Sequence, residues 1–437
     1  MRSTALLTDR YELTMLDTAL RDGTADRRCL FEVFARRLRG GRRFGVVAGT
    51  GRLLTLLQRF RFGDDELRFL RDERIVSADT VRYLENYRFS GTVRGYREGE
   101  LYFPGSPVLS IEGSFADAVI VETLVLSVLN HDSAIATAAA RMSIAAGDRP
   151  LSEMGSRRTS ESAAVAAARA AYIAGFDATS NLEAGRRWGV PTMGTAAHAW
   201  TLLHDSEADA FRAQIATHGT ETTLLIDTYD IARGVDTAIA VAGTSLSAVR
   251  IDSGDLPIVA AQVRRQLDSL GATGTRIIVT SDLDEYAIAA LAASPVDGYG
   301  VGTNLVTGSG TPTAGMVFKL VARQDSAGSW IGVAKASDGK ASVGGRKTAY
   351  RHREATIAAA EVIVLDTDSD AVPEGYRPLQ VTHMRAGDIR DEALGPVGVL
   401  SAREHHRFAR AELPPAAHAL SRADPVLPTR YREGLEG

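Results

Sequence analysis

Five short apolar runs between residues 190 and 303 constrain the fold of this chain more than any other feature. Each run ends in a small, polar or acidic residue, and helical patterns separate them; the runs cover 190–195, 223–227, 248–252, 276–281 and 296–303. Their ends recur every roughly 20 to 32 residues, a spacing typical of βα units. Because parallel strands covered on both faces are continuously apolar, we predict a parallel sheet here.

The polar ends of these runs predict where a ligand would bind. In a βα barrel, the carboxyl ends of the strands form the active-site face. Short side chains there leave room for a ligand, and carboxylates and hydroxyls can hold it. Only about six such units fit, fewer than the eight of a complete barrel. We therefore expect an α/β fold with an incomplete βα (TIM-like) barrel.

The composition excludes several classes of function. The net charge of −4 shows no basic excess for nucleic acid or an anionic membrane surface, so an anionic substrate needs local donors. The single cysteine, Cys29, excludes an intramolecular disulfide and a multi-cysteine metal site, and we interpret it as a buried apolar residue. No apolar run approaches the roughly 18 residues of a membrane span. The first residues lack the pattern of a secretory signal, so we expect a cytoplasmic protein.

Two strand-end motifs are candidates for binding a phosphorylated sugar. Asp252 and Asp255 flank a Ser-Gly turn, and such carboxylates can accept bonds from a diol or bind Mg²⁺; a helix N-cap has the same pattern. The glycines of 298–304 would let backbone N–H groups approach a phosphate. Their spacing is neither a dinucleotide fingerprint nor a Walker loop, and a tight turn explains them equally well.

Basic side chains that could contact an anionic ligand occur in three further places. Arg157 and Arg158 follow a Gly-Ser turn and offer forked donors to carboxylate or phosphate; a surface ion-pair cluster is the alternative. His198 lies just past a strand end in a loop of small residues, although a lone histidine is more often structural. The tail carries basic residues that fit phosphate contacts or solvated loops, at Lys319, Lys335, Arg346 and Lys347.

Taken together and in this order, the motifs resemble those of the nicotinate phosphoribosyltransferase family. The resemblance covers nearly the whole chain and rests on residues 8–15, 155–158, 179–181, 194–198, 252–255, 300–303, 318–321 and 345–347. It implies an incomplete barrel beside an α+β domain formed from both chain ends. The expected domains are an N-terminal part at 1–117, the barrel with the active site at 118–315, and a C-terminal part at 316–437.

The resemblance also implies an activity. Nicotinate and 5-phosphoribosyl 1-diphosphate (PRPP) would condense to nicotinate mononucleotide and diphosphate, a step of NAD salvage. ATP hydrolysis would be coupled through a phosphorylated histidine, and Mg²⁺ would accompany the diphosphate. Members of the family form head-to-tail homodimers with shared active sites. No nucleic acid or membrane partner is implied.

Site roles follow from the same resemblance. His198 would be the phosphate acceptor, with Asp252 and Asp255 holding the ribose hydroxyls and the magnesium–diphosphate. Arg157 would pair with the nicotinate carboxylate and Arg158 with ribose or phosphate. Tyr11 would lie against the pyridine ring, and Gly300, Gly302 and Thr303 would bind the 5′-phosphate. The remaining substrate contacts would be Ser180, Thr195, Ser253 and Gly254.

Four positions depart from the family pattern. Met154 stands where relatives commonly have an aromatic residue, and Ala199 replaces a frequent serine. Ala138 stands where a lysine is usual, and Ala174 where a glycine is usual. A rival family, the nicotinamide-specific enzymes, carries an aspartate around 179–181, and Ser180 lacks the charge that would repel nicotinate. Quinolinate phosphoribosyltransferases are shorter and lack the histidine motif. A non-catalytic nucleotide-binding homologue is disfavoured because every candidate polar residue is retained.

Overall fold

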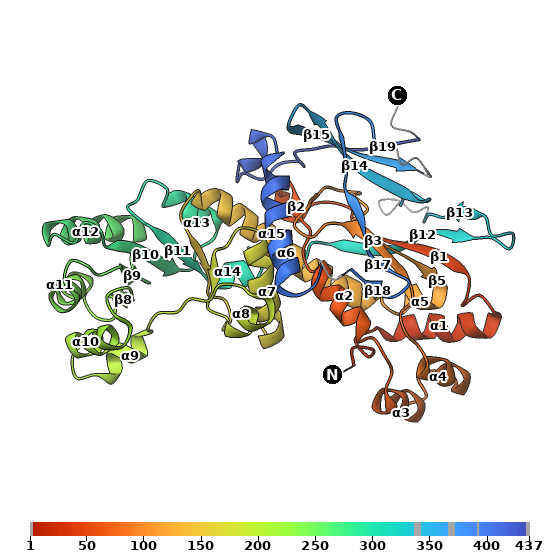
Figure 1. Ribbon diagram of the computed structural model, residues 1–437, viewed down its shortest axis with the longest axis horizontal. Coiled ribbons are helices and arrows are strands. Elements are labelled where there is room, and N and C mark those ends of the chain that lie inside the picture. Colours follow the sequence, from red (N-terminus) through yellow and green to blue (C-terminus); the bar gives the residue numbers. More distant parts are fainter. Residues whose placement is uncertain (1–2, 336–341, 366–371, 391–392, 434–437) are drawn as a thin grey trace. The chain divides into compact units, whose positions relative to one another are not determined.

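A computed structural model of the chain describes residues 3–335, 342–365, 372–390 and 393–433. The chain divides into two compact units (Figure 1). The terminal unit comprises Met1–Thr137 and Thr311–Gly437, and the central unit comprises Ala138–Gly310. Among the described residues, no helix is both long and apolar enough to cross a membrane.

The terminal unit is built on a seven-stranded antiparallel sheet that combines both chain ends. Its strand order is β13 (Trp330–Gly332), β12 (Met316–Gln324), β1 (Arg28–Ala35), β5 (Leu109–Ser114), β3 (Thr92–Tyr96), β17 (Gln380–Arg385) and β18 (Asp388–Ile389). Strand β1 is buried at every position after Arg28. Cys29 on this strand is 2% exposed, and burial raises the pKa of its thiol to about 11. The prediction of a buried, unreactive cysteine is confirmed.

Smaller sheets and helices complete this unit. Strands β16 (Tyr376–Pro378), β14 (Lys347–Glu354), β15 (Ile357–Leu365) and β19 (Thr429–Arg432) form one sheet, and β2 (Gly45–Val46) pairs with β4 (Leu101–Tyr102). The helices are α1 (Arg10–Asp22), α2 (Thr50–Gln58), α3 (Asp64–Asp72), α4 (Ala78–Glu85), α5 (Phe115–Val119) and α15 (Gly395–Ala411). Helix α6 (Glu122–Ala146) begins in this unit and ends in the central one.

The central unit holds a six-stranded sheet in which every pairing is parallel. The order is β7 (Ala178–Thr179), β6 (Leu151–Glu153), β11 (Gly298–Val301), β10 (Arg276–Ser281), β9 (Ala248–Ile251) and β8 (Thr223–Leu225). The helices are α7 (Glu161–Ile173), α8 (Leu182–Trp188), α9 (His198–Leu203), α10 (Glu207–His218), α11 (Ile231–Ala242), α12 (Leu256–Ser269), α13 (Glu285–Ala290) and α14 (Thr303–Val306). The prediction of a mixed α/β fold with a parallel sheet is confirmed.

The run at 190–195 is an exception, and its prediction as a strand was wrong. This segment makes only one isolated parallel bridge, between Thr192 and Thr179. Pro191 lacks the N–H that a central strand must donate, and its carbonyl accepts the amide of Thr179 at 2.9 Å. The segment is therefore a loop that leads from the sheet edge to His198.

Candidate functional site

The carboxyl ends of β8, β9 and β10 bring the predicted catalytic residues of the central unit together. Asp252 follows β9 and Thr280 lies near the end of β10. Asp227 and Thr228 follow β8, and His198 begins α9. Since adjacent parallel strands end on the same edge of a sheet, residues far apart in sequence meet here.

His198 lies between two partners. Its Nδ1 is 3.2 Å from Oγ1 of Thr228, a hydrogen-bond distance. Its Nε2 is 3.9 Å from Oδ2 of Asp252, and both side chains are about two-fifths exposed. The ring is therefore held on one side and accessible on the other.

Asp252 is held by two neighbouring strand ends. Its Oδ1 accepts a hydrogen bond of 2.5 Å from the Thr280 hydroxyl. Its backbone N–H donates to Oδ2 of Asp227 at 2.8 Å, and Oγ of Ser253 donates to the same oxygen at 2.7 Å. The other oxygen of Asp227 is buried without a hydrogen-bond partner among the described residues. Asp227 thus organises the motif after β9.

Asp227 was missed as a site residue. The sequence signal was available, because Asp227 ends the apolar run at 223–227 as Asp252 ends the next one.

The turn after Asp252 leaves Asp255 exposed. Gly254 adopts φ +89°, a left-handed conformation that favours glycine. Asp255 then occupies the N-cap position of α12 without making a side-chain cap bond. Asp255 therefore lies at a helix N-cap, as the alternative interpretation predicts, but its carboxylate does not cap the helix.

Arg250 is a second site residue that the sequence did not reveal. It lies on β9, and its guanidinium donates to Oγ1 of Thr195, one of the predicted substrate contacts. Burial lowers the pKa of Arg250, whereas Asp252 and Asp227 oppose this shift. Arg250 stands inside an apolar run, so the sequence indicated a strand at this position and no site residue.

Buried Glu153 joins the predicted loops at 155–158 and 179–181. Its carboxylate accepts 2.5 Å hydrogen bonds from the Gly155 amide and the Thr179 hydroxyl. Burial raises the pKa of Glu153. The Ser180 amide donates to the Glu153 carbonyl at 2.8 Å. Arg157, Arg158 and Ser180 are exposed, so their side chains are available to a ligand.

Gly300 on β11 and Gly302, just after that strand, have different surroundings. A Cβ on Gly300 would lie 2.5 Å from Cγ2 of Thr280 and 2.7 Å from Sδ of Met154, so close packing excludes a side chain. A Cβ on Gly302 would be 3.4 Å from the nearest atom, the Met154 carbonyl oxygen. A side chain at Gly302, next to Thr303 at the start of α14, would therefore meet only ordinary van der Waals contacts.

The other predicted contacts belong to the terminal unit. Tyr11 on α1 is 47% exposed, and burial together with Glu122 raises the pKa of its hydroxyl. Lys319 lies 3.9 Å from Glu122, and Arg346 pairs with Glu112 at 3.1 Å.

Lys347 has a different environment from the other basic residues of the tail. It is 6% exposed, and its ammonium donates to both oxygens of Glu32 at 3.0 Å. Its charge is thus already paired inside the unit, whereas Lys335 is exposed.

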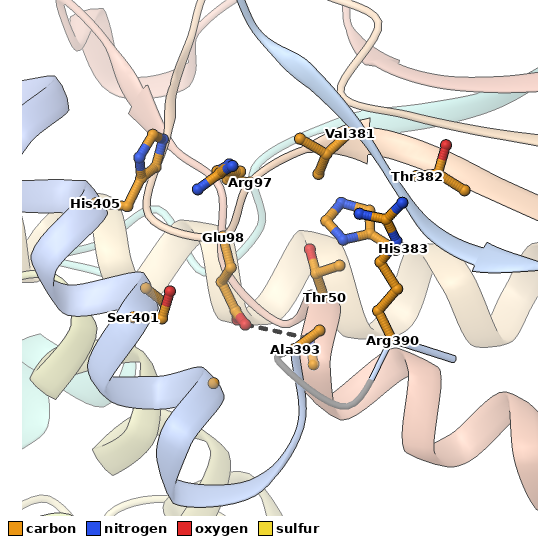
Figure 2. A pocket seen from close by; sticks show the side chains of 13 residues that line it. Thr50, Arg97, Glu98, Val381, Thr382, His383, Arg390, Ala393, Ser401 and His405 are labelled. Atoms are coloured by element: carbon orange, nitrogen blue, oxygen red, sulfur yellow. Dashed lines mark hydrogen bonds between the residues drawn. The ribbon is translucent and has the colours of Figure 1, made fainter. Parts of the chain in front are cut away.

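A separate hollow of about 120 Å³ lies within the terminal unit (Figure 2). It is bordered by Arg97, Glu98, His383, Arg390 and His405. The Glu98 carboxylate accepts the amide of Gly51 at 3.1 Å. None of the predicted site residues lines this hollow. In the described ranges, no group of three or more His, Cys, Asp or Glu is placed to hold a metal ion.

Comparison with known proteins gives consistent similarities along the chain. Residues 6–130 match the nicotinate phosphoribosyltransferase (NAPRTase) N-terminal domain, and residues 150–362 match the NAPRTase family. The chain is 55% identical over 434 residues to the nicotinate phosphoribosyltransferase pncB1 of Mycobacterium tuberculosis, covering 97% of this chain and 94% of that protein. It is 39% identical to a Bacillus subtilis nicotinate phosphoribosyltransferase over 80% of this chain and 73% of the relative.

A solved structure shares the fold. The human nicotinic acid phosphoribosyltransferase superposes with a TM-score of 0.83 at 24% identity, covering 98% of both chains.

Proposed function

The chain belongs to the nicotinate phosphoribosyltransferase family, and from this we propose that it condenses nicotinate with PRPP to give nicotinate mononucleotide and diphosphate. The observation that carries the proposal is the meeting of His198, Asp252 and Asp227 at the carboxyl edge of the parallel sheet. The ring nitrogen of nicotinate forms the bond to C1′ of the ribose, and the bond from C1′ to the diphosphate oxygen breaks. The electron pair of that bond leaves with diphosphate.

Selection of the base rests on Arg157 and Ser180. The Arg157 guanidinium pairs with the nicotinate carboxylate through forked donors. Ser180 is neutral, so it does not repel that carboxylate as an aspartate would. Tyr11 would lie against the pyridine ring from the partner copy in a homodimer with shared active sites.

Binding of PRPP rests on the strand-end carboxylates and glycines. Asp252 and Asp255 accept hydrogen bonds from the ribose hydroxyls, and negative charge near C1′ stabilises an oxocarbenium-like ribose. Gly300, Gly302 and Thr303 hold the 5′-phosphate, while Arg158, Thr195, Ser253 and Gly254 complete the contacts. Lys319, Lys335, Arg346 and Lys347 are further phosphate candidates, with Lys347 least available because it is paired with Glu32.

ATP coupling runs through His198. Its imidazole takes the γ-phosphoryl group, and later hydrolysis of phosphohistidine drives the reaction forward. Mg²⁺ bound with the diphosphate would offset negative charge on the leaving group. Asp252 and Asp255 would lie near this cation, and oxygens of the diphosphate and water would supply its other ligands, since no group of three carboxylates among the described residues is placed to hold a metal ion by itself.

The proposed architecture follows the family. The parallel sheet forms an incomplete barrel, and the segments 1–117 and 316–437 form one separate α+β domain. The division into two compact units supports this proposal, although the first boundary falls after Thr137 rather than residue 117. We further propose a cytoplasmic location.

Labelling with γ-³²P-ATP tests the proposal. The wild type is expected to carry an acid-labile, base-stable label, and His198→Ala is expected to carry none. His418→Ala, a change at an exposed histidine of the terminal unit, serves as the matched control and retains the label. Parallel assays of nicotinate and nicotinamide with PRPP should give faster turnover of nicotinate. Faster turnover of nicotinamide would overturn the proposed choice of base. An unlabelled wild type would overturn the proposed ATP coupling.

A further inference from the structure

Thr228 faces the histidine on the side away from the catalytic carboxylate. Its Oγ1 lies 3.2 Å from Nδ1 of His198, and Asp252 lies 3.9 Å from Nε2. We propose that Thr228 is a positioning residue: its hydroxyl oxygen accepts a hydrogen bond from the Nδ1–H group of His198, so that the Nε2 lone pair is free to take the phosphoryl group. This inference rests on the proposed ATP coupling through His198.

The two neighbours of the ring would favour different tautomers. An imidazole nitrogen keeps its proton where the better acceptor lies, and the hydrogen bond at one nitrogen sets the state of the other. Asp252 alone would draw the proton to Nε2 and occupy its lone pair. However, the 3.9 Å separation exceeds a hydrogen bond, and one oxygen of Asp252 already accepts from Thr280. Thr228 is at hydrogen-bond distance from Nδ1, and with its hydroxyl oxygen as the acceptor the ring keeps its proton on Nδ1.

The position of Thr228 is fixed by its surroundings. It comes directly after Asp227, whose Oδ2 is anchored by the Asp252 amide and the Ser253 hydroxyl. A β-branched side chain has few χ1 rotamers, so the hydroxyl of Thr228 loses little freedom when it meets the ring. Asp227 thus holds the motif after β9, and its neighbour Thr228 holds His198.

The phosphoryl transfer is balanced in this geometry. The Nε2 lone pair forms the bond to the γ-phosphorus of ATP, and the bond from that phosphorus to the bridging oxygen breaks with its electron pair going to ADP. The ring gains one positive charge and keeps its Nδ1 proton. Thr228 accepts that proton's hydrogen bond before and after transfer, and no further reactant is required.

Histidine-selective ¹⁵N NMR of the full-length protein measures the tautomer directly. The His198 signals are assigned as those missing from His198→Ala. We expect Nδ1–H in the wild type and in Thr228→Ser, and a shift toward Nε2–H in Thr228→Val, which keeps the shape but removes the acceptor. Thr237→Val on α11, where the hydroxyl bonds only its own helix at Arg233, is the control and should match the wild type.

Phosphohistidine formation is the second readout. Thr228→Val is expected to slow labelling by γ-³²P-ATP about tenfold, the effect of one lost hydrogen bond, and Thr228→Ser should restore it. Unchanged labelling in Thr228→Val, or Nε2–H in the wild type, overturns the role of Thr228. A wild type that takes no label overturns the ATP coupling and, with it, this inference. In that case the NMR result reports the tautomer of His198 and says nothing about phosphoryl transfer.

Discussion

Oδ1 of Asp252 accepts a 2.5 Å hydrogen bond from Oγ1 of Thr280, so the neighbouring strand holds one carboxylate oxygen while the other faces His198 at 3.9 Å. Rigid placement of a charge is what makes electrostatic stabilisation effective. In the proposed reaction, the Asp252 carboxylate would stabilise the ribose without first reorganising.

Asp252→Asn tests this charge. The substitution keeps the shape and one acceptor but removes the negative charge, and we expect kcat with nicotinate to fall about 100-fold, as for other fixed electrostatic groups. Steady-state assays with both substrates saturating measure it. The melting temperature should stay near that of the wild type; a variant with more than half the wild-type kcat would show that the charge is not needed.

Ser180→Asp tests the choice of base. A carboxylate close to that of nicotinate should repel it by about 1 kcal/mol at an exposed site, which lowers kcat/KM for nicotinate about fivefold. Ser180→Asn has nearly the same shape without the charge and is the matched control. Equal kcat/KM in these two variants would remove Ser180 from the specificity argument.

The two glycines of β11 and its end should respond differently to alanine. In Gly300→Ala the new Cβ clashes with Thr280 and Met154, so we expect a loss of about 1–3 kcal/mol in the free energy of unfolding. In Gly302→Ala the Cβ meets nothing closer than 3.4 Å, so stability should hold while the KM for PRPP rises. Urea unfolding and PRPP titration separate the effects. An unchanged KM in Gly302→Ala would argue against a 5′-phosphate there.

Lys347 provides a test of packing against phosphate binding. Removing the ammonium in Lys347→Met leaves Glu32 buried without its partner, and breaking such a pair costs about 3–5 kcal/mol. Denaturant unfolding should show this loss, and the double variant Glu32→Gln/Lys347→Met should recover much of it. A variant of normal stability with a raised KM for PRPP would instead favour a phosphate contact.

The sequence predicted the central-unit strands that lie in an apolar run and failed where no such run marks the strand. The runs ending at Asp227 and Asp252 are strand ends because parallel strands must be apolar on both faces. Strands β6 (Leu-Ser-Glu) and β7 (Ala-Thr) contain too few apolar residues to form a run, whereas β8, which is as short as β6, lies inside the run at 223–227. The run at 190–195 has the apolar composition of a strand, but Pro191 has no backbone N–H to donate, a signal that the sequence itself carries.

The candidate site also contains residues that could be predicted from the sequence and residues that could not. His198 and Asp252 could be predicted because their residue types are chemically specific at strand ends. Arg250, Thr228 and Glu153 could not, because their roles depend on which strand lies beside which. Glu153 in particular is a buried carboxylate that ties two loops together, and only the pairing of β6 with β7 brings those loops into reach.

Buried His406 on α15 should make stability depend on pH. It is 3% exposed, its Nδ1–H donates to the Gly99 carbonyl at 3.0 Å, and its Nε2 has no partner among the described residues. Burial lowers the pKa of His406 to about 4. An unfolded histidine titrates near pH 6.5, so between about pH 6.5 and 4 the unfolded state binds a proton that the folded state does not. The free energy of unfolding should therefore fall as the pH falls through this window, by up to about 3 kcal/mol from this group.

His406→Asn isolates this contribution, because asparagine keeps a donor toward Gly99 but does not titrate. Urea unfolding at pH 7, 6, 5 and 4 should show a shallower decline for His406→Asn than for the wild type. Carboxylates contribute equally to both proteins, so the difference between the two curves reports His406 alone. His218→Asn, at an exposed site on α10, should keep the wild-type slope. Parallel curves for the wild type and His406→Asn would mean that His406 is protonated as readily in the folded protein as in the unfolded chain.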